Sequence, residues 1–146
     1  MSTTIQREVT VPFSAEQMFA LVNDVQAYPE FLPWCEQTQV LRAAGNELDA
    51  SITLKKGAIR KTFATRNFNQ PGRQIQVTLL DGPFRSLEGY WYFEDQPDGG
   101  SRVVLDMQFE FANRLLDRAI GPVFREIVKN LVNAFKRRAF SMYTRP

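Results

Sequence analysis

The side chains best suited to proton transfer in this sequence are carboxylates, because its 146 residues include no histidine. Without histidine there is no Ser-His or Cys-His pair, and no histidine ligand for a metal ion. Cys35 is the single cysteine, so an internal disulfide and a cysteine metal cluster are both excluded. Its neighbours Phe31 and Trp34 predict an apolar niche, in which a cysteine behaves as a small buried hydrophobe.

The carboxylates show no pattern typical of an acid–base pair. Asp106 and Glu110 share a predicted strand face with Gln108, which favours a solvated outer face over a catalytic one. Asp81 stands in a turn, where aspartate is expected to bond the backbone. The Gly-rich phosphate-binding patterns GxGxxG and GxxxxGK(S/T) are also absent. We therefore expect no catalytic residue, no metal site and no enzyme activity.

Basic side chains gather at one predicted hairpin and near the C-terminal end of the chain. They are Lys55, Lys56, Arg60 and Lys61 at the hairpin, and Lys136 and Arg137 on the last helix. A solvated rim is the interpretation that we prefer, and contact with RNA phosphate or anionic lipid is the alternative. The net charge of +2 is too small to indicate nucleic acid by itself, and we expect no DNA partner.

Large apolar side chains are the positive signal, since the chain has 12 Phe, 4 Tyr and 2 Trp. A filled core is their default role, but a curved sheet packed on a helix commonly leaves a gap that an apolar ligand can occupy. Gly89 interrupts the row of inward residues, which indicates a bulge or local space there. The inward positions that we assign to ligand binding are Phe63, Leu79, Leu87, Trp91, Phe93, Met107 and Phe109 on strands, and Phe124, Val128, Leu131 and Phe135 on the last helix.

A strand and two short helices are expected at the start of the chain. Residues 4–11 have a β-type pattern, after which Ser14 stands where a helix N-cap is expected. Gln17, at the third helical position, completes a capping box. A second short helix is expected to begin at Asp24 and to end before Pro29.

Six further strands are predicted by alternation of apolar and polar residues, with Gly- or Pro-containing turns at four of their junctions. Consecutive strands joined by short turns form an antiparallel meander. The expected ranges are 37–42, 46–55, 59–68, 73–80, 84–94 and 102–111.

After Asn113 the apolar period changes from 2 to 3.6, which predicts a helix reaching about Tyr143. Gly121-Pro122 lies inside this pattern and predicts a break or kink, with a helix start at Pro122 as one solution. This helix is the only large element able to cover the apolar face of the sheet. We expect a single α+β domain over residues 1–146: a curved antiparallel sheet of about seven strands packed on a long C-terminal helix.

Three stretches of the sequence resemble a known family: Val11–Val22, Tyr28–Cys35 and Asp81–Phe93. They are similar to the START-type coenzyme Q-binding proteins and to the bacterial ribosome-association toxins, a superfamily often called polyketide cyclase-like. Phe109–Asn113 also fits, and the resemblance covers nearly the whole chain. It implies a helix-grip fold of the START/Bet v 1 type.

The resemblance also implies a function. Members bind ubiquinone or a related polyprenyl lipid in support of respiration, and some bacterial members bind the large ribosomal subunit and block translation initiation. No cofactor is implied besides a bound ubiquinone-like lipid, and no catalytic residue carries over. In this setting Phe31, Leu32 and Trp34 are expected to form an apolar gate, and Phe84 another part of the rim.

The N-terminus lacks the apolar segment of a secretory signal and the Arg-rich stretch of a transit peptide. No apolar run approaches the roughly 18 residues of a membrane span. We therefore expect a cytoplasmic bacterial protein, with peripheral membrane contact as a further option.

Overall fold

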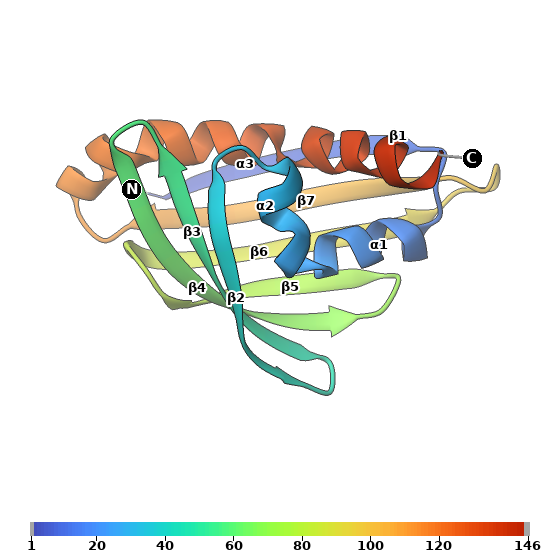
Figure 1. Cartoon of the computed structure of the whole chain (residues 1–146), viewed down its shortest axis with the longest axis horizontal. Helices are drawn as coiled ribbons and strands as arrows, with labels where there is room; N and C mark the ends of the chain where they lie inside the picture. The colour runs from blue at the N-terminus through green and yellow to red at the C-terminus, as the bar shows by residue number, and fades with distance from the viewer. Residues whose placement is uncertain (1, 145–146) are drawn as a thin grey trace.

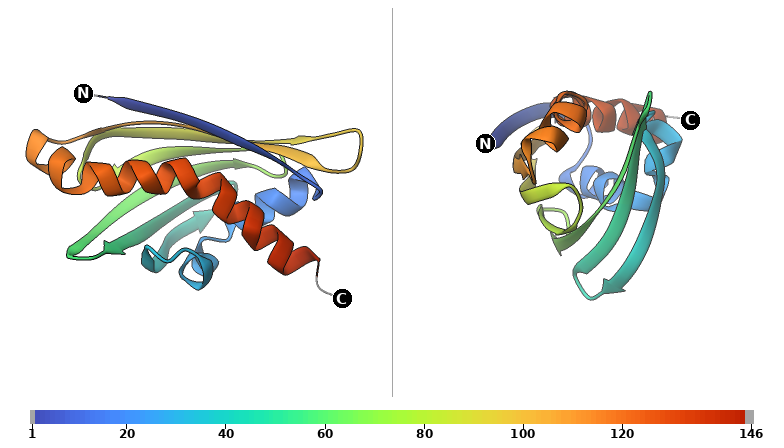
Figure 2. Two further views of the ribbon diagram at one scale, coloured as in Figure 1. Left: turned by 90° about the horizontal axis from the view of Figure 1, so that it is seen from above. Right: turned by 90° about the vertical axis from the view of Figure 1, so that its left-hand side faces the viewer.

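A strongly curved antiparallel sheet wraps around a long C-terminal helix in the computed structural model, which describes residues 2–144 (Figures 1 and 2). The strands lie in the order β1-β7-β6-β5-β4-β3-β2, so the meander follows the chain and β1 pairs with β7. This confirms the predicted helix-grip architecture. The strands are β1 Thr3–Val11, β2 Cys35–Ala44, β3 Glu47–Lys56, β4 Ile59–Gln70, β5 Gln74–Asp81, β6 Phe84–Asp95 and β7 Ser101–Phe111.

The first short helix, α1 (Ala15–Asn23), begins with the predicted capping box. The Gln17 backbone N–H donates to Ser14 Oγ at 3.1 Å, and the Ser14 backbone N–H donates to Gln17 Oε1 at 2.9 Å. Two of the backbone donors that a helix leaves unpaired at its start are thus satisfied by one local exchange.

The second short helix differs from the prediction. A 3-10 turn, η1 (Val25–Ala27), is followed by α2 (Tyr28–Phe31), which includes Pro29 rather than ending before it. Proline is tolerated in the first turn of a helix, because the N–H that it lacks has no intrahelical partner there. The prediction gave weight to proline as a helix stop and missed its use as a helix start.

The C-terminal helix α3 (Arg114–Tyr143) continues through Pro122, so the predicted start at Pro122 is wrong. Asn113 is the N-cap, and its side chain accepts a hydrogen bond from the Leu116 backbone N–H at 2.9 Å. A strong cap nine residues before the proline was thus enough to begin the helix there.

An ion pair spans the proline turn of α3. Asp117 and Arg125 meet at 3.0 Å across Gly121, where an added Cβ would come within 2.5 Å of the Asp117 carboxylate. The missing side chain at Gly121 therefore leaves room for the pair, which ties together the turns on both sides of Pro122.

The core lies between the concave face of the sheet and one face of α3. Phe124 stands at its centre, with the rings of Phe63, Phe84, Phe109 and Phe111 at centroid distances of 4.8 to 6.0 Å. The helix side chains buried in this core are Ile120, Phe124, Val128, Val132, Phe135 and Ala139. Phe124, Val128 and Phe135 are among the helix positions that the sequence predicted to face inward.

Two glycines on and beside β6 adjust this packing. Gly82 adopts a φ of +147°, and a Cβ there would lie 2.6 Å from Cβ of Phe63, so the Asp81-Gly82-Pro83-Phe84 turn needs glycine. Gly89 keeps regular pairing with Val77 and Met107, so the predicted bulge at Gly89 is wrong. The space above Gly89 is taken by Met107, whose Cε would lie 3.1 Å from an added Cβ.

Candidate functional site

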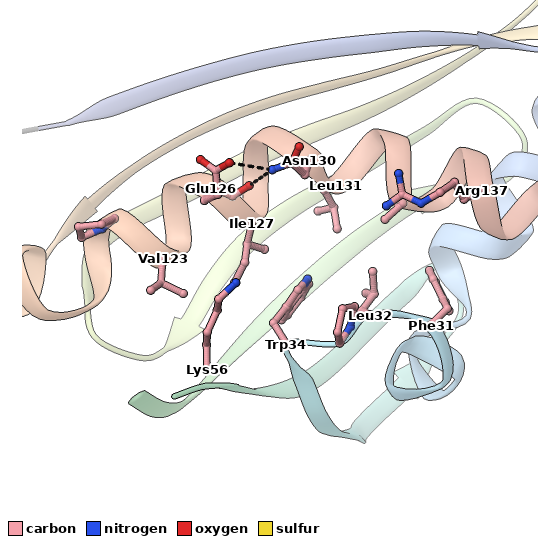
Figure 3. A pocket seen from close by; sticks show the side chains of 13 residues that line it. Phe31, Leu32, Trp34, Lys56, Val123, Glu126, Ile127, Asn130, Leu131 and Arg137 are labelled. Atoms are coloured by element: carbon pink, nitrogen blue, oxygen red, sulfur yellow. Dashed lines mark hydrogen bonds between the residues drawn. The ribbon is translucent and has the colours of Figure 1, made fainter. Parts of the chain in front are cut away.

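A groove of about 390 Å³ runs between α3 and the segment that follows α2 (Figure 3). Its walls are mostly apolar, and its four polar side chains are exposed to solvent. The groove is lined by Phe31, Leu32, Pro33, Trp34, Lys56, Pro122, Val123, Glu126, Ile127, Asn130, Leu131, Ala134 and Arg137.

The helix side of the groove is a row of aliphatic side chains. Val123, Ile127 and Leu131 recur every four residues, which places them on one face of α3, and Figure 3 shows them pointing into the groove. The Glu126 and Asn130 side chains bond each other on the same helix at 3.2 Å, away from this row. An apolar ligand lying along α3 would therefore contact hydrocarbon.

The opposite side is held against α3 near Phe31. Its ring lies 5.3 Å from that of Phe135, and the Arg138 guanidinium lies 4.8 Å above the Phe31 ring. Arg138 also pairs with Glu30 at 3.0 Å, so α2 is fixed to α3 at this end of the groove. The remaining wall, through Trp34, depends on a short loop between α2 and β2.

A smaller inner cavity of about 80 Å³ lies between the sheet and α3. Trp34, Ile127 and Leu131 line both spaces, so these three side chains form the boundary between the groove and the inner cavity. The other residues that line the inner cavity are Val22, Val25, Tyr28, Ala50, Ile52, Phe63, Thr65, Asn67, Val77, Leu87, Trp91, Met107, Phe124, Val128 and Phe135.

Most of the predicted ligand-binding residues meet at these two spaces. Phe31 and Leu32 line the groove, Trp34 and Leu131 line both spaces, and the inner cavity takes Phe63, Leu87, Trp91, Met107, Phe124, Val128 and Phe135. Leu79, Phe84, Phe93 and Phe109 lie on neither surface. Phe84 is packed among the core rings, with the ring of Phe111 at 4.9 Å, rather than standing at the rim.

Two lining residues were missed because they are polar. Thr65 and Asn67 follow Phe63 at every second position of β4, and they are only 5% and 7% exposed. The strand alternation alone would have placed them inward with Phe63. The same alternation turns Phe68 to the outside, where it is 38% exposed.

Two buried ionisable side chains near the site, Cys35 and Tyr28, stay neutral at pH 7. Burial raises the pKa of the Cys35 thiol to about 11, and burial also raises the pKa of Tyr28. The Tyr28 hydroxyl donates to the Val22 carbonyl oxygen. Within residues 2–144, no group of three or more Cys, Asp or Glu side chains is placed to hold a metal ion.

The basic hairpin is partly neutralised by a single acid. Glu36 pairs with Arg60 at 2.7 Å and with Lys55 at 3.6 Å. Lys56, Lys61, Lys136 and Arg137 make no ion pair with any part of the chain that the structure describes. These four residues carry the uncompensated positive charge of this region. None of the described helices is long and apolar enough to cross a bilayer.

The comparisons with known proteins agree with this geometry. Residues 11–136 match the model of the family described as polyketide cyclase / dehydrase and lipid transport. The chain belongs to this family. It is 45% identical, over 95% of its length and 96% of the relative, to the ribosome association toxin RatA of Vibrio cholerae. It is 31% identical, over 91% of its length and 56% of the relative, to the coenzyme Q-binding protein COQ10 homolog B, mitochondrial, of Xenopus laevis.

Solved structures share the fold at low identity. A START superfamily protein from Mycobacterium smegmatis superposes with a TM-score of 0.79 at 18% identity, covering 95% of this chain and 98% of that one. The Zhui aromatase/cyclase from Streptomyces sp. R1128 gives 0.81 at 19% identity, covering 95% and 94%. The START-like fold is thus confirmed, and it is one that also occurs in enzymes.

Proposed function

We propose that this protein binds an apolar small molecule, a polyprenyl quinone such as ubiquinone, between α3 and the curved sheet, and so supports respiration. The observation that carries the proposal is the continuous apolar surface from the groove, past Trp34, Ile127 and Leu131, into the inner cavity. The lipid-transport family and the name of the coenzyme Q-binding relative support it.

The sizes of the two spaces decide how such a ligand would lie. An inner cavity of about 80 Å³ is far below the roughly 300–1,000 Å³ of a typical ligand pocket, whereas the groove of about 390 Å³ is within that range. The tail therefore belongs in the groove. Burial contributes about 0.8 kcal/mol per methylene-sized group, so two isoprenoid units of about ten carbons give roughly 8 kcal/mol before the costs of association. Micromolar affinity corresponds to about 8 kcal/mol after those costs, so burial of the ring must contribute in addition to the tail.

The chemistry of the lining supports binding rather than turnover. Among the described residues, Tyr28 is the only ionisable side chain that lines the inner cavity; its hydroxyl donates to the Val22 carbonyl oxygen, and burial raises its pKa. Glu126, on the groove, bonds Asn130 on its own helix. General acid–base catalysis needs a group whose pKa lies near the working pH and which can reach the substrate. We therefore infer a carrier or chaperone role.

The test is a titration of the protein with a short-chain ubiquinone, followed by quenching of tryptophan fluorescence. Leu131→Gln places an amide at the boundary of the two spaces and should weaken binding at least tenfold. Leu115→Gln is the matched control, because Leu115 is 76% exposed on the same helix. Unchanged affinity in Leu131→Gln, with both variants folded, would contradict the proposal.

Ribosome association is a second candidate, favoured by the 45% identity to a ribosome association toxin. The unpaired cations Lys56, Lys61, Lys136 and Arg137 are the side chains that we assign to contact with ribosomal RNA or, alternatively, anionic lipid headgroups. Association through phosphate contacts falls steeply with salt. Either role places the protein in the bacterial cytoplasm, with contact at the membrane surface when a quinone is exchanged.

Charge reversal separates the two candidates. Lys56→Glu with Lys61→Glu should abolish co-sedimentation with large ribosomal subunits at low salt, while Arg7→Glu, on the distant strand β1, should not. Quinone binding should survive in Arg7→Glu and in Lys61→Glu alone, since neither Arg7 nor Lys61 lines the groove, whereas Lys56 does. Co-sedimentation that is unchanged by the double reversal, and by reversal of Lys136 and Arg137, would exclude this surface as the RNA contact.

A further inference from the structure

Thr65 and Asn67 form a polar pair in a cavity wall that is otherwise hydrocarbon and aromatic. Thr65 Oγ1 donates to Asn67 Oδ1 at 3.4 Å, and within residues 2–144 neither side chain makes another hydrogen bond. Both N–H groups of Asn67 Nδ2 are therefore left without a protein acceptor, although the residue is 7% exposed. Among the described residues, the fully buried side-chain atoms without a partner are Asn69 Oδ1 and Ser101 Oγ, so Asn67 Nδ2 is accessible from the cavity and can donate to a molecule placed there.

The surroundings of the pair define the acceptor. In the part of the chain that the structure describes, no Lys, Arg, Asp or Glu side chain lines the inner cavity, so a charged ligand group placed there would have no counter-charge. The other polar groups of the lining are the Tyr28 hydroxyl, which already donates to a backbone carbonyl, and the indole N–H groups of Trp34 and Trp91, which are donors as well. A neutral oxygen acceptor, such as the carbonyl of a quinone or another ketone, matches an amide donor in this setting.

The size of the cavity fixes the orientation of the ligand. A space of about 80 Å³ admits one end of a ligand and not an extended hydrocarbon tail, which the groove can hold. The polar pair lines the inner cavity, while the helix wall of the groove offers Val123, Ile127 and Leu131. The ring end should therefore pass the boundary at Trp34, and the tail should stay outside it.

We propose that Asn67, positioned by Thr65, donates a hydrogen bond to a neutral carbonyl oxygen on the ring of the ligand, which enters the inner cavity ring first. This proposal rests on the proposed apolar-ligand function and adds to it the chemical class and the direction of entry. A fatty acid would be a poor ligand, since its carboxylate would be buried without a cation.

The first test compares two probes on the full-length protein: a short-chain ubiquinone, and an alkylbenzene of similar length that has no oxygen. Asn67→Leu should bind the quinone about tenfold more weakly, while its affinity for the alkylbenzene stays within about twofold. Thr65→Val should show a smaller loss for the quinone. Thr78→Val is the control, because Thr78 on β5 bonds the Arg66 carbonyl and is absent from the cavity lining.

Folding does not confound this test. Replacing both partners of a buried hydrogen bond by apolar groups of similar shape is close to neutral, so the double variant Thr65→Val with Asn67→Leu should melt near the wild-type temperature, whereas Asn67→Leu alone leaves the Thr65 hydroxyl without its acceptor. A variant that is at least as stable but binds the quinone more weakly separates recognition from structure.

The second test uses the two tryptophans of the chain, Trp34 at the boundary and Trp91 in the inner cavity. In Trp34→Phe, the quinone should quench Trp91 strongly at saturation, and adding Asn67→Leu should reduce that quenching. Stronger quenching of Trp34, measured in Trp91→Phe, would indicate the reverse orientation and overturn the proposal.

The outcomes remain distinguishable from those of the proposed function. Equal quinone affinity in wild type and Asn67→Leu would overturn the role of Asn67 and leave apolar binding intact. Failure of the wild type to bind either probe would remove the apolar-ligand function, and this proposal with it.

Discussion

Filling the inner cavity should stabilise the protein and at the same time remove ligand binding. Ala50 is suited to this test, because it is 1% exposed, lines the inner cavity and lies directly opposite Thr65 in the β3–β4 pair. Ala50→Leu adds three carbon atoms beside the polar pair, in space that the ring of the ligand would use.

The expected gain follows from the cavity volume. Empty core volume costs about 24 cal/mol per Å³, so complete filling of a cavity of about 80 Å³ would add about 2 kcal/mol to the free energy of unfolding. A leucine that fills half of it gives about 1 kcal/mol, provided that it packs without strain. Ligand affinity should fall by more than tenfold, since the ring and the leucine cannot share the space.

Urea unfolding measures the free energy of unfolding, and fluorescence titration with a short-chain ubiquinone measures the affinity. Ala44→Leu is the matched control, because Ala44 is exposed on β2 and the exchange has the same effect on strand propensity. Destabilisation by Ala50→Leu together with unchanged affinity would refute the reasoning, since it would show that the inner cavity is neither empty nor part of the site.

Three further predictions concern stability and reactivity. Gly82→Ala should lower the free energy of unfolding, measured by urea titration, by at least about 2 kcal/mol, because the positive φ and the close approach of Phe63 both disfavour a Cβ at this position. An unchanged free energy of unfolding would mean that the turn is mobile. Cys35 should react with iodoacetamide at pH 8 roughly a hundredfold more slowly than free cysteine, since its pKa is raised to about 11; rapid native-state labelling would contradict this. The hydrogen bond from Arg66 lowers the pKa of Asp49, so the ionised pair stabilises the fold above the unfolded pKa of about 3.9 and ceases to do so as the pH falls through the lower folded pKa. In acid unfolding, Asp49→Asn should therefore flatten the dependence of stability on pH in this range. A pH profile identical to that of the wild type would exclude the pair as the source of this dependence.

The fold was predictable from the sequence because its signals are local and repeated. Alternation along the six later strands, and the change of period after Asn113, specify which faces must meet. The errors in the predicted helix bounds occurred at prolines. Pro29 and Pro122 were interpreted as helix boundaries, whereas caps and tertiary packing let both lie inside helices. The Asp117–Arg125 pair across Pro122 could not be anticipated without knowing that the helix continues.

The site was predictable only in part. Strand parity assigned Trp91, helical spacing assigned Leu131 and the family resemblance assigned Trp34 to the site, and all three line the two spaces. These signals could not separate lining residues from core residues such as Phe109. That distinction depends on sheet curvature and ring packing, which sequence periodicity does not contain. Asn67 was missed because inward positions were searched for apolar residues alone.

The central claim is that an apolar ligand binds between α3 and the sheet. It is tested most directly by identifying the lipid that is bound to the purified protein. Protein purified without detergent from bacterial membranes and cytosol is extracted with organic solvent, and the extract is analysed by mass spectrometry beside Ala50→Leu and Ala44→Leu. The account predicts a polyprenyl quinone, near one per chain, in wild type and Ala44→Leu, and its loss in Ala50→Leu. A wild-type protein that carries no lipid and takes up none from quinone-loaded vesicles would contradict it.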